Sequence, residues 1–148
     1  MNQAPLTAMA DLLTRSGWAY NVFLRAYQVE TAHRASSVEI VAQALGEQAQ
    51  LGGLEPFDRD QVIVEVSNFL CYTGERGGGP DPDLIDSAGF KALLAVVVDE
   101  VEECMAEARM VERFWLQEGH PAHPVFWDFA FLFKGQREAV LLIGSASD

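Results

Sequence analysis

The sequence predicts a single α+β domain over residues 1–148, a bundle of about four helices with a C-terminal β-hairpin packed against it. From Ser87 to about Gln117, apolar residues recur at alternating steps of four and three, which is the spacing of one helix face. After Pro124 the pattern changes to two aromatic-rich or aliphatic runs around the short turn Lys134–Arg137, which is typical of a β-hairpin. With 49% apolar residues, a chain of 148 residues can bury a core as one domain.

The N-terminal part of the chain predicts helix rather than strand. From Leu6 to about Ala32, apolar residues keep the spacing of one helix face, and Ser16-Gly17 interrupts good helix formers. We therefore expect a kinked helix, or two consecutive helices, in this stretch. A strand over Trp18–Val29 is the alternative interpretation, because tyrosine, valine and phenylalanine are frequent there.

Capping signals predict two further helices. Ser36 and Glu39 match a capping box, and the helix that it begins is expected to end at Gly52-Gly53. Asp58 is expected to cap the next helix, which runs through a β-branched stretch that is ambiguous by composition. The glycines, prolines and acids of residues 75–86 predict a loop that leads into a short helical turn.

The charge is strongly acidic and unevenly distributed. The net charge is −12, and the stretch from Asp81 to Glu107 holds eight acids against one base, Lys91. Such a field repels nucleic acid and anionic membranes and attracts a basic partner. We therefore expect a basic protein partner, and neither nucleic acid nor a membrane. The alternative is that these acids only keep the protein in solution.

The acids of the long predicted helix lie largely outside its apolar stripe, so we expect them on an exposed surface. They are Asp99, Glu100, Glu102, Glu103, Glu107 and Glu112. The residues that we assign to partner binding are Asp81, Asp83, Asp99, Glu100, Glu103 and Glu107. The expected function is that of an acidic binding module with an inhibitory, immunity or chaperone-like role.

The alternative function is a metal- or small-molecule-binding enzyme within the helical bundle. His120-x-x-His123 and Glu30-x-x-His33 have spacings at which two side chains can share a metal ion. Neither pattern has the further ligands that such sites need, so we expect no metal and no cofactor, and assign no catalytic residue. Asp128 stands alone in an aromatic strand, where it is either partly buried with a perturbed pKa or guards a strand edge.

Location and assembly are predicted from the N-terminus, the two cysteines and the hairpin. The N-terminus lacks a basic region followed by an apolar segment, and Cys71 and Cys104 suit buried free thiols, so we expect a cytoplasmic protein. The predicted hairpin is apolar on both faces and open at its edges. It therefore either pairs with a second copy, which would give a homodimer, or is covered by the first helix. Ser145 and Ser147 are expected in an exposed tail.

Overall fold

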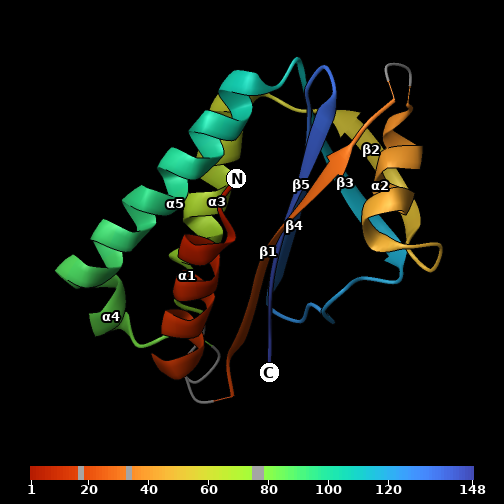
Figure 1. The fold of residues 1–148 in the computed structure, drawn as a ribbon. Coiled ribbons are helices and arrows are strands. Elements are labelled where there is room, and N and C mark those ends of the chain that lie inside the picture. Colours follow the sequence, from red (N-terminus) through yellow and green to blue (C-terminus); the bar gives the residue numbers. More distant parts are fainter. Residues whose placement is uncertain (17–18, 33–34, 75–78) are drawn as a thin grey trace.

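The structure is a computed structural model that describes residues 1–16, 19–32, 35–74 and 79–148. In these residues, a five-stranded antiparallel sheet has the order β1-β5-β4-β3-β2 (Figure 1). The strands are β1 Asn21–Glu30, β2 Gln50–Pro56, β3 Met110–Glu118, β4 Trp127–Lys134 and β5 Glu138–Ser147. The helices are α1 Gln3–Ser16, α2 Ser37–Leu45, α3 Arg59–Leu70, α4 Pro82–Asp86 and α5 Ala88–Glu107. Figure 1 shows α1, α3 and α5 on one side of the sheet and α2 on the other.

The predicted bundle with a C-terminal hairpin is wrong. The last two strands do pair with each other, from Trp127 opposite Ala146 to Lys134 opposite Ala139. They are not a terminal hairpin, because β5 also pairs with β1 and β4 also pairs with β3. An isolated two-stranded ribbon is unstable in water, and here three further strands extend it into a sheet that helices cover.

β1 occupies part of the stretch for which we predicted helix, so the strand alternative is right there. The helical prediction holds only for α1, and Gly17 of the predicted kink lies outside the described residues. β1 pairs with β5 along its whole length, from Asn21 opposite Ser147 to Glu30 opposite Glu138. The predicted exposed tail is therefore wrong as well, since it forms the end of β5 and Ser145 is buried.

The capping signals mark helix starts correctly. Ser36 and Glu39 form both bonds of the predicted capping box, and Asp58 accepts from the backbone of α3. The first of these helices ends at Leu45, earlier than predicted. Gly46 follows at φ +89°, and the predicted stop at Gly52-Gly53 lies within β2.

The long predicted helix is also shorter than its apolar stripe suggests, because it ends at Glu107 and β3 begins at Met110. Arg59 at the start of α3 donates to the backbone carbonyls of Met105 and Ala108, each at 2.6 Å. These bonds add a charged donor at the end of α5, where the Ala108 N–H also donates to the Met105 carbonyl.

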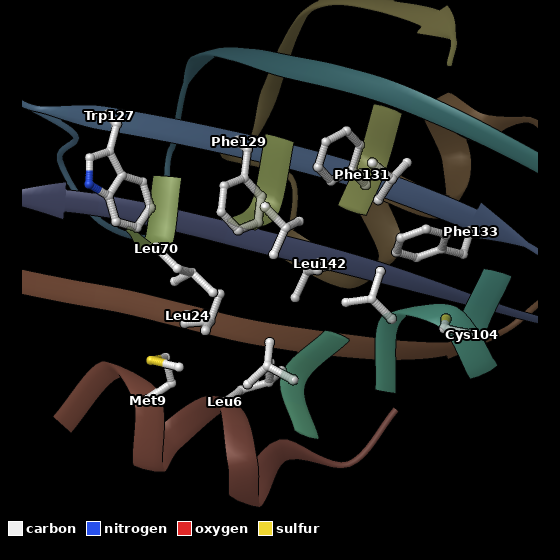
Figure 2. Close-up of a cluster of buried hydrophobic side chains, with 14 of the residues drawn as sticks. Leu6, Met9, Leu24, Leu70, Cys104, Trp127, Phe129, Phe131, Phe133 and Leu142 are labelled. Carbon is white, nitrogen blue, oxygen red and sulfur yellow. The ribbon is translucent and has the colours of Figure 1, made fainter. Parts of the chain in front are cut away.

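The sheet buries side chains on both faces. On the side of α1, α3 and α5, four aromatic rings of β4 form a row: Trp127, Phe129, Phe131 and Phe133 (Figure 2). Neighbouring rings along this row have centroids 5.7–6.4 Å apart. On the side of α2, Ile40 and Val41 pack with a second buried set that includes Phe114 and Leu132.

Glu112 corrects another expectation, because it is only 6% exposed instead of lying on the acidic surface. Its carboxylate accepts a hydrogen bond from the Ser37 hydroxyl, which joins the first turn of α2 to β3. A buried carboxylate needs such a partner, and the positive end of a helix is a favourable place for it.

The described helices include none that is long and apolar enough to cross a membrane.

Both strands of the predicted hairpin have a neighbouring strand on each side. The hairpin therefore lacks the two open edges on which we based the prediction of a dimer. The edges of the sheet are β1 and β2 instead.

Candidate functional site

The acids assigned to partner binding lie mostly on the surface of α4 and α5. Asp81 caps α4 by accepting from the backbone N–H of Asp83, and both residues are exposed. Asp99, Glu103 and Glu107 are exposed along α5. Asp99, Glu103 and Glu107 are spaced four residues apart, and residues at this spacing lie on the same face of a helix.

Glu100 differs from the other assigned acids. It is half-buried, and its Oε2 accepts from the backbone N–H of Asn2 at 2.6 Å. This bond holds the start of the chain against α5. Glu100 therefore has a structural contact, whereas Glu102, which we did not assign, is exposed on the same helix.

The exposed acids of α5 form a continuous stripe with small apolar residues. We call this stripe the outer face of α5; its residues are Ala92, Ala95, Val96, Asp99, Glu102, Glu103, Ala106 and Glu107, all exposed. Val96 is 46% exposed although it is apolar. The outer face is therefore acidic mainly in the C-terminal half of α5 and apolar in its N-terminal half, at Ala92, Ala95 and Val96.

Few basic groups offset this charge. Lys91, the one base between Asp81 and Glu107, lies 3.4 Å from Asp86. Among the described residues, the four acids of the outer face take part in no ion pair. The field of these carboxylates therefore acts on solvent and on whatever approaches α5.

The structure does not bring the candidate metal ligands together. Glu30 ends β1 opposite Glu138, whereas His120 and His123 lie in the loop before β4, at the opposite end of the sheet. Seven residues of β5 separate these ends, which is roughly 20 Å in an extended strand. His33 lies outside the described residues. In the described part of the chain, no group of three or more histidine, cysteine, aspartate or glutamate side chains is placed to hold a metal ion.

His120 has a specific environment of its own. Its Nδ1 accepts from the backbone N–H of Ala122 at 3.0 Å, and its Nε2 is buried without a hydrogen-bond partner. Burial lowers the pKa of His120, and this effect outweighs the attraction of the Asp128 carboxylate. The imidazole is therefore held neutral, which suits a packing role in the loop.

Neither thiol is arranged for nucleophilic chemistry. Cys71 and Cys104 are free, as expected, and Cys104 is buried whereas Cys71 is half-buried. Burial raises the pKa of Cys104 to about 11. A thiol with so high a pKa carries almost no thiolate at neutral pH, and the thiolate is the reactive form.

A second surface feature lies where β3 and β4 separate. The two strands pair only from Met110 opposite Lys134 to Arg113 opposite Phe131. Beyond this point, β3 continues to pair with β2 and β4 with β5. An open pocket of about 320 Å³ lies between them, which we call the Trp115 pocket; its lining residues are Glu55, Arg113, Phe114, Trp115, Asp128, Phe129 and Ala130.

Carboxylates outnumber bases around this pocket. The Arg113 guanidinium lies 3.4 Å from Glu65 Oε2 and 5.6 Å from the centre of the Phe57 ring, so two neighbours already engage it. The other oxygen of Glu65, Oε1, is buried without a hydrogen-bond partner. The pKa of Glu65 is raised, chiefly by burial; Arg113 lowers it, and the charges of Asp128 and Glu55 raise it further.

Trp115 supplies an aromatic surface at the pocket. Its side chain is 45% exposed, and its indole lies against the main chain of Gly52 and Gly53 on the neighbouring strand. A methyl group at Gly52 would lie 2.6 Å from the indole Cδ1, and one at Gly53 would lie closer still to the ring. The two glycines therefore make room for the ring, which is supported on one side and open to solvent on the other.

Sequence reasoning missed this pocket for a definable reason. We interpreted Trp115 as part of a helical stripe and Gly52-Gly53 as a helix stop, so nothing placed them in contact. The β-branched and aromatic residues Val111, Phe114 and Trp115, which are frequent in strands, were the signal that could have identified a strand there. Asp128, which we expected to be partly buried or to guard an edge strand, is exposed and lies on β4 inside the sheet; its charge raises the pKa of Glu65.

Comparisons of the chain with profiles of known protein families, with curated proteins and with solved structures gave no match.

Proposed function

We propose that the protein is a binding module that captures a basic protein partner on the outer face of α5. The observation that carries the proposal is the arrangement of Asp99, Glu102, Glu103 and Glu107. All four are exposed on one side of one helix, with no ion pair to a described base. Carboxylates in this arrangement attract a basic surface over several ångströms and orient it before contact.

The apolar part of the outer face supports docking beyond simple attraction. Ala92, Ala95 and Val96 present small side chains that allow another chain to approach α5 closely. A segment with basic residues along one part and small apolar residues along another would match both halves of the face. An amphipathic basic helix has this pattern, and helices bind to such surfaces through residues three and four apart.

The wild-type protein and two triple variants, used as baits in a capture experiment, test the proposal. Glu102, Glu103 and Glu107 are changed to lysine in one variant, and the exposed acids Glu47, Glu118 and Glu138 in the matched control. Both variants change the net charge by the same amount. Because surface substitutions alter stability by about 0.5 kcal/mol or less each, both should remain folded.

The outer-face variant should lose a basic protein that both the wild type and the control variant retain. The retained amount should also fall as salt rises from about 0.05 to 0.5 M, because ions screen exposed charges. Equal capture by the two variants would show that only total charge matters, and would contradict a docking role for α5.

A further inference from the structure

We propose that the Trp115 pocket, which Trp115, Glu55 and Asp128 all line, binds an organic cation, an ammonium or guanidinium group. The group can belong to a lysine or arginine side chain of a polypeptide or to a small amine. This site is distinct from the outer face of α5, since Figure 1 shows α5 and β2 on opposite sides of the molecule. It stands or falls independently of the proposed function.

The first argument is the support of the indole. The chain places an aromatic ring that is 45% exposed over two consecutive glycines that have no Cβ to displace it. Both glycines belong to the strand next to Trp115, so the position of the ring is determined by backbone pairing. The result is a fixed ring with one free side, and the face of an indole is the strongest aromatic partner for a cation.

The second argument is the charge beside the ring. Glu55 and Asp128 are exposed and line the pocket, and among its lining residues Arg113 is the one base. Arg113 is already engaged by Glu65 and by the Phe57 ring, so it does not neutralise the two exposed carboxylates. The pocket therefore has an excess of negative charge next to an aromatic surface, and both features favour a cation over an anion.

The third argument separates an organic cation from a metal ion. Glu55, Glu65 and Asp128 are not placed to share a metal ion. Glu55 and Asp128 instead line a volume of about 320 Å³, which exceeds the volume of a bare ion and suits an alkyl chain with a charged end. The buried oxygen of Glu65 that has no partner leaves a further acceptor near the pocket.

The test follows the indole N–H signal of Trp115 in ¹H–¹⁵N spectra, identified by its loss in Trp115→Phe. The probes are agmatine, a peptide of three arginines, and n-butylurea as an uncharged compound of similar shape to a guanidinium. Glu55→Gln and Asp128→Asn remove one carboxylate each from the pocket, and Glu138→Gln is the control at the opposite end of the sheet. Trp115→Ala removes the aromatic surface. Because this variant lacks the indole signal, the binding of the cation to it is followed by calorimetry.

We expect a saturable shift with agmatine or with the peptide, and none with n-butylurea. Trp115→Ala should weaken binding about two- to fivefold, the range that an exposed cation–aromatic contact provides. Glu55→Gln and Asp128→Asn should each weaken it too, and Glu138→Gln should not. Saturation by agmatine supports a site for which a small amine suffices. Saturation by the peptide alone supports a site for a basic side chain of a polypeptide.

The proposal is overturned if neither probe gives a saturable shift, or if n-butylurea binds equally well. It is also overturned if the cation binds Glu55→Gln and Asp128→Asn as tightly as the wild type. All substitutions in this set replace exposed side chains, so each variant should fold. Thermal unfolding curves check this before each variant is titrated.

Discussion

The side-chain amide of Gln3 bonds to the backbone around Ala26 as a neighbouring strand would. Its Oε1 accepts from the Ala26 N–H at 2.9 Å, and its Nε2 donates to the Leu24 carbonyl at 3.1 Å. Further along the same edge, the Thr14 hydroxyl accepts from the Val22 N–H at 3.0 Å. Two side chains of α1 thus satisfy the free edge of β1, which otherwise invites another chain to pair with it.

Replacement of Gln3 by alanine should therefore destabilise the protein by about 1–2 kcal/mol, because two partly buried backbone groups lose their partner. Urea unfolding measures the loss, and Gln61→Ala, an exposed glutamine in the first turn of α3, is the matched control. The variant should also self-associate more readily at high concentration, because β1 is then open. Equal unfolding midpoints for the two variants would show that the Gln3 bonds add nothing.

Arg59→Gln should destabilise the last turn of α5. The guanidinium donates to two carbonyls there, and hydrogen bonds from a charged donor contribute more than neutral ones; partial exposure reduces the loss to about 1–2 kcal/mol. Hydrogen exchange should quicken in the last turn of α5 more than in α1. Arg109→Gln, which removes an exposed arginine just after α5, serves as the control. Unchanged exchange in Arg59→Gln would refute the capping role.

His120 should make the folded state sensitive to mild acid. Its pKa is lowered by burial, so the unfolded chain binds a proton at a higher pH than the folded chain does. The contribution of His120 to stability is complete above about pH 6.5 and is lost as the pH falls from there toward the lowered value. Unfolding free energies measured from pH 7.5 to 5 should therefore fall more steeply for the wild type than for His120→Gln.

His123→Gln, which removes an exposed imidazole from the same loop, controls for the general effect of acid. The pH profile of this control should run parallel to that of the wild type. If the pH profile of His120→Gln also runs parallel to that of the wild type, the buried imidazole does not contribute to the pH dependence.

Signals that depend on a few neighbouring residues were sufficient to locate several helix starts and the last two strands. Ser36 with Glu39, Asp58 and Asp81 all cap helices, because a capping bond joins residues only two or three apart. The alternating residues of β4 and β5 likewise predicted their pairing. The acids of α5 are mostly exposed, as their position outside the apolar stripe predicted, with Glu100 the half-buried exception.

The tertiary structure decided the identity of β1, β2 and β3, whose composition is compatible with more than one element. β1 is a strand because β5 offers it a partner along its whole length, and β3 is a strand because it lies between β2 and β4. Strand preference depends on such neighbours more than on the residues themselves. The Trp115 pocket arises in the same way, since Gly53 and Trp115 become neighbours only when β2 pairs with β3.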